Sequence, residues 1–271
     1  MLGRVPEGEV IDWVRAACAT FEFDVAGVFR RKGDHAWPLS AADPLDLEAK
    51  LLGGGHLLPL PKEPASLANV LEVAIVDHMV ETAGDDPGIQ FVRGSERGYP
   101  DVELSGTRFG AGFHAIDVKV ARLDDNPVRT RSRITLYTGN TYFRWPQLHW
   151  PGTLRPFAEY ESHLDLIALY RFVPEEPSRV ADLDLLVQPA WRIASRQRSS
   201  TTREYIGAVE SVEDLRAGRG EFPSPQEFYD YWRAFPFRIS QQVQRQLERL
   251  IRLQQARITE LEGRSGGGGP R

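Results

Sequence analysis

The spacing of apolar residues along the chain predicts both helices and strands. Apolar positions recur three or four residues apart, as on one face of a helix, in residues 8–21, 66–84, 161–173, 224–235 and 239–262. Shorter apolar stretches with the character of strands occupy residues 21–29, 35–40, 101–106, 114–123, 182–188 and 190–195, and residues 131–145 suggest another strand that leads into a loop. Residues 43–64 are rich in leucine, glycine and proline, which favours a loop with one short helix.

The order of these elements indicates the fold class. Helices and strands are interspersed without strict alternation, which favours a mixed α/β or α+β fold over a doubly wound parallel sheet. We therefore expect a central mixed β-sheet flanked by helices.

The composition narrows the class of protein. Apolar residues make up 41% of the chain and charged residues 26%, as in ordinary soluble globular proteins. The single cysteine, Cys18, excludes a disulfide within the chain and a zinc site of the C-x-x-C type. The chain has no apolar run as long as about 18 residues and no signal-peptide layout at its N-terminus. We expect a cytoplasmic protein with no membrane partner.

The distribution of charge changes the picture that the net charge gives. A net charge of −5 argues mildly against a nucleic-acid partner when it is averaged over the chain. Residues 126–158 and 185–203, however, contain no Asp or Glu. The arginines in these two segments are Arg129, Arg131, Arg133, Arg144, Arg155, Arg192, Arg196, Arg198 and Arg203. They suggest surfaces for an anion, and ordinary solvated arginines are the alternative.

Two acids and a lysine stand out among the apolar residues of 98–122. Asp117 and Lys119 are two residues apart on a predicted strand, so their side chains project from the same face. Ile116, Val118 and Val120 then lie on the other face. Asp101 begins the preceding strand and reaches Asp117 if the two strands pair.

Converging carboxylates indicate a cation site. Two buried acids are unfavourable together unless a cation lies between them, and Mg²⁺ prefers carboxylate oxygens and retained waters. A metal makes water acidic enough to attack a phosphate, and a lysine can orient or deprotonate that water or stabilise charge on the phosphate. The chain has only four lysines, so one beside two acids favours a need for a compact ammonium group. A chance lysine at the edge of a sheet remains the alternative.

The motif and several further segments resemble a known family. YPDVEL followed by AIDVK resembles the PD-(D/E)xK nuclease motif, and residues 23–235 resemble the EcoRV-type restriction endonucleases. The similarity runs through FDVAGVF, ANVLEVAI, ITLYTGNTYFR and GRGEFPSPQEFYDYWR. The resemblance implies a restriction-endonuclease-like domain over residues 1–237. A helix at 238–263 and a flexible tail at 264–271 follow it.

The resemblance also implies an activity and its partners. It implies a type II restriction endonuclease that uses Mg²⁺, with Mn²⁺ as a substitute, to cut both strands of double-stranded DNA at a short palindrome. It further implies a homodimer in the bacterial cytoplasm and a cognate DNA methyltransferase encoded beside it. A repair or structure-specific nuclease of the same superfamily and a non-catalytic DNA-binding protein of the same fold are the alternatives.

The resemblance assigns roles to particular residues. Asp101, Asp117 and Lys119 fall on the catalytic trio, and the two acids are expected metal ligands. Glu72 falls on a helical acid that assists the metal, although its spacing alone would place it on a polar helix face. DNA base-reading is implied for Arg196, Arg198, Ser199, Ser200, Thr201, Thr202 and Arg203. Minor-groove or backbone contacts are implied for Ser95, Glu96, Arg97 and Thr141.

The composition of the base-reading segment predicts the kind of target. SSTTR contains an arginine and no Asn or Gly, unlike the family, so the family's own recognition site is not expected. Arginine pairs bidentately with guanine in the major groove, which predicts at least one guanine per half-site, read by Arg203 or Arg198. The alternative is that these arginines hold phosphates and carry no sequence information.

Overall fold

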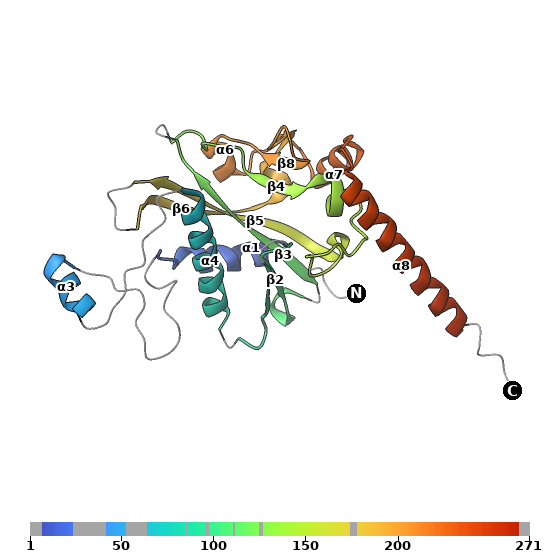
Figure 1. Ribbon diagram of the computed structural model, residues 1–271, viewed down its shortest axis with the longest axis horizontal. Helices are drawn as coiled ribbons and strands as arrows, with labels where there is room; N and C mark the ends of the chain where they lie inside the picture. The colour runs from blue at the N-terminus through green and yellow to red at the C-terminus, as the bar shows by residue number, and fades with distance from the viewer. Residues whose placement is uncertain are drawn as a thin grey trace.

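The computed structural model describes residues 7–23, 42–52, 64–84, 86–95, 98–110, 112–124, 127–173 and 178–265. Its larger sheet has five strands in the order β1-β2-β3-β5-β6 (Figure 1). These strands are β1 (Gln90–Arg93), β2 (Val102–Ser105), β3 (Phe113–Arg122), β5 (Tyr160–Phe172) and β6 (Val180–Pro189). Strands β3 and β5 are parallel and the other neighbours are antiparallel, so the sheet is mixed, as predicted.

A second, antiparallel sheet packs over one face of the first. Its three strands have the order β4-β8-β7, and they are β4 (Thr135–Thr138), β7 (Ala194–Arg198) and β8 (Tyr205–Ala208). The helices are α1 (Glu7–Ala19), α3 (Pro44–Leu52), α4 (Pro64–Ala83), α5 (Ala190–Ile193), α6 (Val212–Ala217), α7 (Pro225–Ala234) and α8 (Gln241–Ser265). Three short helical turns are η1 (Thr107–Phe109), η2 (Gly139–Phe143) and η3 (Phe157–Glu159).

The alternation of side chains along β3 and β5 divides the core into two clusters. Ile116 and Val118 face a cluster that α1 and α4 complete, and Val120 packs against the same cluster. Ala115 and Ala121 face the other cluster, to which the second sheet, α6 and α7 contribute. This is the predicted alternation, and it places Asp117 and Lys119 on the face toward the second sheet.

Strand β5 corrects the prediction of a helix at residues 161–173. This segment is buried along nearly its whole length between β3 and β6. A strand buried on both faces has a nearly continuous apolar sequence, and such a run also satisfies the spacing of a helix. The pairing with β3 and β6, which are distant in sequence, decided between the two.

The other predictions meet mixed outcomes. Residues 190–195 were expected as a strand, but the four residues of α5 form a helical turn first and β7 starts at Ala194. The helices at 66–84, 224–235 and 239–262 correspond to α4, α7 and α8, and the short helix within 43–64 to α3. The Ser224 hydroxyl caps α7 by accepting from the Glu227 amide at 3.2 Å. Most of the strands predicted at 21–29 and 35–40 lies outside the described residues.

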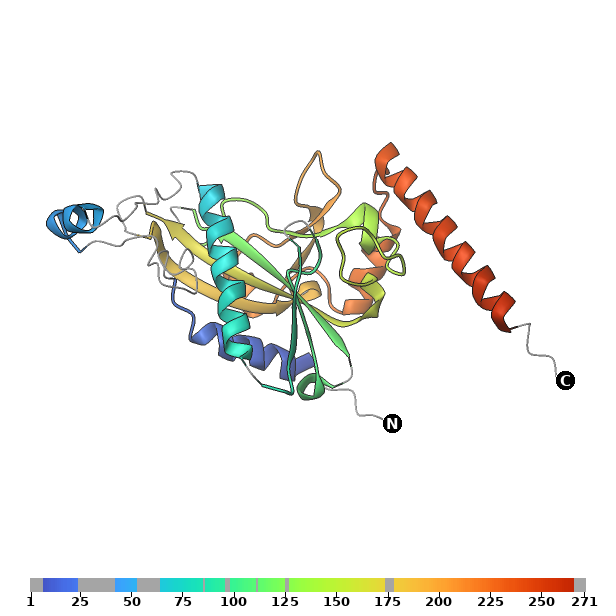
Figure 2. The same ribbon diagram turned by 60° about the horizontal axis from the view of Figure 1, so that its bottom comes forward.

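Helix α8 extends away from both sheets toward the C-terminus (Figure 2). Its first turns lie partly against the body of the protein, whereas every described side chain from Ile251 onward is exposed. The body of the fold therefore does not depend on the distal half of α8 for its core.

Candidate active site

Strands β2 and β3 bring the predicted trio together. They pair antiparallel with Val102 opposite Ile116, so Asp101, one residue before β2, lies beside the part of β3 that holds Asp117. The Asp101 carboxylate accepts a hydrogen bond from the backbone amide of Val118 at 2.6 Å. Because β2 starts only at Val102, this carboxylate provides the β3 amide with an acceptor beyond the end of the ladder. The strand pairing thereby fixes the position of Asp101.

Asp117 and Lys119 form a buried ion pair. The Lys119 Nζ lies 2.5 Å from the Asp117 Oδ2, and both residues are largely shielded from solvent. Burial is the main cause that raises the pKa of Asp117, the Lys119 ammonium opposes it, and the negative charge of Asp101 adds to it. Burial alone would lower the pKa of Lys119, but the surrounding carboxylates of Asp117, Asp101 and Asp165 outweigh that effect and raise it. The lysine is therefore an ammonium in this arrangement.

Glu72 approaches the trio from helix α4. A cavity of about 370 Å³ opens at this point, and Glu72, Asp101, Asp117 and Lys119 all line it. Burial and the nearby charge of Asp101 raise the pKa of Glu72, while the positive charges of Lys119 and Arg93 lower it. These couplings place Glu72 within electrostatic reach of the trio, and its expected role of assisting a metal stays a prediction.

Aromatic residues that the sequence did not single out form the wall of this site. Tyr99, Tyr137 and Tyr142 line the cavity, and Tyr99 packs against both of the other two rings. The Tyr99 hydroxyl is bonded to His163 Nδ1 at 2.5 Å. Burial raises the pKa of all three hydroxyls, so they remain protonated. The charge of Asp117 adds to this rise at all three hydroxyls, so the tyrosine wall lies close to that carboxylate.

Asp165 is a further acid that the sequence interpretation missed. It lies on β5, directly opposite Asp117 in the register, and it is fully buried. Burial raises its pKa from 3.8 to about 7, with Lys119 lowering and Asp101 raising it. The available signal was a lone acid within an apolar run, which the helical interpretation of residues 161–173 concealed.

The chemistry of this donor set suits a hard divalent cation. Among the described residues, no three His, Cys, Asp or Glu side chains are grouped as a complete metal site. Mg²⁺ does not need one, because it is commonly held by one or two carboxylates, waters and substrate phosphates. Asp101 lies close enough to Asp117 for its negative charge to raise the pKa of Asp117. A cation bound between the two carboxylates would relieve this repulsion.

A comparison with protein-family models now decides the family. The model described as "Restriction endonuclease EcoRV" matches residues 34–256, which is most of the chain. The chain belongs to the EcoRV restriction endonuclease family. Its mixed sheet with flanking helices is accordingly a restriction-endonuclease-like fold, and the chain is a nuclease by family. A search of curated proteins finds no match.

The predicted base-reading residues of this EcoRV family member lie on the hairpin of β7 and β8. Tyr205, the first residue of β8, lines the catalytic cavity, so the hairpin projects from the edge of that cavity. Arg198 is engaged within the protein, where its Nη1 donates to Glu204 Oε1 at 2.9 Å. Arg203 is exposed and lies over the ring of Tyr205. The geometry therefore favours Arg203 over Arg198 as the arginine presented to a ligand.

The remaining residues of this segment differ in their contacts. Arg196 lies over the rings of Phe222 and Tyr231 and is exposed. The Ser199 hydroxyl is bonded to the hydroxyl of Thr135 at 2.7 Å, which ties it to β4. In the turn, the hydroxyls of Ser200 and Thr202 are hydrogen-bonded to each other, and Thr201 is exposed to solvent.

The predicted minor-groove and backbone residues lie at two separate places. Ser95 is exposed just after β1, and Glu96 and Arg97 lie outside the described residues. Thr141 lies in η2, where its backbone leaves the helical region with φ −125 and ψ −112. The neighbouring Tyr142 lines the catalytic cavity. Thr141 is thus close along the chain to the site but does not line the cavity.

Partners within the protein account for three arginines of the segment 126–158. Arg155 forms two hydrogen bonds to the buried carboxylate of Glu103, at 2.6 and 2.8 Å. Arg133 pairs with Glu210, and Arg144 donates to the backbone carbonyl of Phe235. For Arg155 and Arg133 the anion-surface interpretation is wrong, because each pairs with an acid that is distant in sequence.

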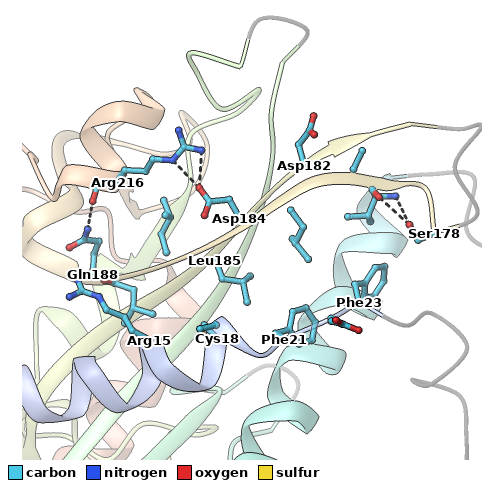
Figure 3. Close-up of a pocket in the computed structure, with 17 residues that line it drawn as sticks. Arg15, Cys18, Phe21, Phe23, Ser178, Asp182, Asp184, Leu185, Gln188 and Arg216 are labelled. Atoms are coloured by element: carbon cyan, nitrogen blue, oxygen red, sulfur yellow. Dashed lines mark hydrogen bonds and ion pairs between the residues drawn. The ribbon is translucent and has the colours of Figure 1, made fainter.

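A larger hollow of about 800 Å³ lies between α1 and β6 and is not the catalytic cavity (Figure 3). Arg216 is paired with Asp184 at 2.8 Å, and Gln188 donates to the backbone carbonyl of Arg216 at 2.7 Å. Burial raises the pKa of Cys18 to about 12, so the thiol is an unreactive one. The two β6 carboxylates that line this hollow, Asp182 and Asp184, are both engaged in ion pairs.

Within the part of the chain that is described, no helix is both long and apolar enough to cross a bilayer.

Proposed function

We propose that this protein is a type II restriction endonuclease that hydrolyses phosphodiester bonds in both strands of duplex DNA at a short palindrome, using Mg²⁺. The observation that carries the proposal is the convergence of Asp101, Asp117 and Lys119 on one cavity in a chain of the EcoRV family. Glu72 lines the same cavity from α4.

Asp101 and Asp117 are the residues that would hold the metal, with Glu72 assisting. Their carboxylates are the ligand type that Mg²⁺ prefers, and Mn²⁺ is an expected substitute. When bound, the metal supplies the acidity that water needs to attack a phosphate at neutral pH and offsets negative charge there. The Asp101 carboxylate is already oriented by the Val118 amide, so it needs little rearrangement to act as a ligand.

Lys119 stabilises the charge that develops on the phosphate. Its raised pKa keeps it protonated, which favours this electrostatic role over removal of a proton from water. The wall of Tyr99, Tyr137 and Tyr142 lowers the local dielectric, so the interaction between the ammonium group and phosphate oxygens is stronger than in water.

A palindromic target implies two copies of this site. Each copy of the chain contains one set of Asp101, Asp117 and Lys119. Cutting two strands at symmetric positions requires two such sets related by a two-fold axis. The proposed assembly is therefore a homodimer on double-stranded DNA. A DNA methyltransferase encoded beside this chain would support assignment to a restriction-modification system.

Cleavage of plasmid DNA by purified variants tests the proposal. With Mg²⁺, Asp117→Ala abolishes cleavage, because it removes a metal ligand. Lys119→Arg lowers kcat by roughly 10²–10³-fold, because a broad fixed fork cannot replace a compact ammonium group. Asp182→Asn is the matched control, since asparagine tolerates the positive φ of 52° at this position and the exposed ion pair with Arg171 lies at the far end of β6. Robust cleavage by Asp117→Ala, or wild-type rates for Lys119→Arg, would contradict the proposal.

A further inference from the structure

Asp165 is a buried carboxylate that the chemistry proposed above does not use. Its exposed fraction is 0%, and neither carboxylate oxygen has a hydrogen-bond partner among the described residues. An unpaired carboxylate in the interior is strongly unfavourable, and an apolar side chain would be easier to bury there. Ile167 and Leu169, on the same face of β5, show that this face otherwise accepts apolar residues. Folding alone therefore does not account for an acid at this position.

The strand register places Asp165 beside the catalytic set. In the parallel pair of β3 and β5, Asp165 is the partner of Asp117, and Ile167 is the partner of Lys119. Side chains at paired positions point to the same face, so Asp165 lies diagonally from Lys119 on that face. Asp117 lines the cavity, whereas Asp165 is not among its lining residues. Lys119 thus forms an ion pair with an acid that lines the cavity, and it interacts through its charge with a second acid that does not.

Lys119 is the positively charged group that interacts with Asp165. The hydroxyl of Tyr137 is buried near it, also without a hydrogen-bond partner in the described structure. Burial and the charge of Asp165 raise the pKa of Tyr137, and Asp165 contributes in the same direction at Tyr99. Of the charged groups that act on Asp165, Lys119 is the positive one and Asp101 the negative one.

We propose that Asp165 is a positioning residue that holds the Lys119 ammonium group in place during the reaction, an inference that rests on the function proposed above. Asp117 would interact with two cations at once, because it pairs with Lys119 and would also bind the metal. A divalent cation on Asp117 weakens its hold on the lysine. Asp165, which the cavity does not reach, keeps a negative charge beside Lys119 when that happens.

The first experiment separates a functional role from a structural one. Asp165→Asn keeps the shape and removes the charge, so we expect kcat for plasmid cleavage to fall by about 10–100-fold. Affinity for duplex DNA, measured with Ca²⁺ in place of Mg²⁺, stays unchanged. The melting temperature does not fall, because an unpaired buried charge has been removed. Asp184→Asn, the same change at a partly exposed ion pair on β6, leaves both activity and DNA affinity as in the wild type.

The second experiment does not depend on activity. Melting temperatures of the metal-free protein are compared for Asp165→Asn, Lys119→Met and the double variant. If Asp165 interacts with Lys119, removal of the acid raises the melting temperature more in the Lys119→Met background, where its charge has no counter-ion.

The outcomes are distinguishable. Strictly additive shifts would overturn the proposed pairing. Wild-type kcat in Asp165→Asn would overturn the positioning role, as would parallel losses of activity and stability. If the wild type itself cleaves no DNA, the proposed function fails, while the double-variant comparison still decides whether Asp165 and Lys119 interact.

Discussion

At the scale of single residues, burial decides what the charged side chains do. Asp117, Lys119 and Asp165 lie where the dielectric is low, so their charges act strongly on one another. Glu103 is equally buried, but Arg155 meets both of its oxygens and lies over the ring of Phe113. Asp117, Lys119 and Asp165, which include the proposed catalytic residues, carry charges that are incompletely paired. Glu103 and Arg155 are fully paired, and their interaction stabilises the fold.

The ion pair of Glu103 and Arg155 predicts a large effect on stability. Arg155→Ala leaves a buried carboxylate without a partner, so we expect a loss of about 2–4 kcal/mol in the free energy of unfolding, measured by urea titration. Arg171→Ala removes an exposed pair with Asp182 and serves as the control, with an expected loss below about 1 kcal/mol. Equal losses in the two variants would show that Glu103 is not held as described.

Asp165 also predicts a pH dependence of stability. Its pKa is raised from 3.8 to about 7, so the folded state binds this proton more tightly than the unfolded state does. Its contribution is therefore most favourable below about pH 4 and is lost as the pH rises through about 7. Asp165→Asn has no carboxyl group to titrate, so its stability does not show this decrease with rising pH.

The measurement compares melting temperatures of wild type and Asp165→Asn in EDTA. The advantage of the variant should grow by the equivalent of about 2–4 kcal/mol between about pH 4 and about pH 8. A constant difference across this range would mean that Asp165 does not titrate between these values.

At the scale of elements, the site depends on where strands end and what lies beside them. Strand β2 starts only at Val102, which leaves the Asp101 carboxylate to accept from the β3 backbone, and β5 lies directly beside β3. The hairpin of β7 and β8 starts at the edge of the same cavity. The proposed catalytic residues therefore belong to the five-stranded sheet and the proposed base-reading residues to the second sheet, and residues of both sheets line the same cavity.

The hairpin predicts different roles for its arginines. Arg203→Ala should weaken the free energy of DNA binding by about 1–3 kcal/mol and relax preference at one guanine position, because the guanidinium is exposed and its one hydrogen bond, to the Tyr205 hydroxyl, can be exchanged for a base edge. Arg198→Ala should leave base preference unchanged, since Arg198 is paired with Glu204. Cleavage mapping on a random DNA library distinguishes them. If Arg203→Ala instead weakens binding to every sequence alike and shallows its salt dependence, Arg203 contacts phosphate.

At the scale of the whole molecule, the second sheet lies over the larger one and α8 extends beyond them (Figure 1). The core clusters draw on α1, α4, both sheets and α7, with Phe237 as the last residue toward the C-terminus. The Asn140 amide donates to the carbonyl of Arg238 at 2.8 Å, which secures the chain before α8 begins. Within the described residues, the two core clusters are therefore complete before α8 begins.

Truncation after Ser240 tests this division. The shortened chain should unfold at nearly the wild-type temperature, because the exposed distal side chains of α8 add little to the core. We also expect both chains to sediment as dimers on a DNA duplex at micromolar concentration, since the proposed two-fold arrangement needs the catalytic domain and not α8. A truncated chain that remains monomeric on DNA would assign dimer formation to α8.

The sequence by itself determined the local features of this protein. The helical spacing of 66–84 and the two-residue alternation around Asp117 and Lys119 depend on neighbours along the chain, so both could be predicted. The tertiary structure decided what depends on distant residues. It made 161–173 a strand because β3 and β6 flank it, gave Arg155 an acid that its own segment lacks, and set Asp165 against Asp117. The spacing of residues along a strand determines only the face of the sheet on which a side chain lies. Its neighbour across the sheet is determined by which strands pair.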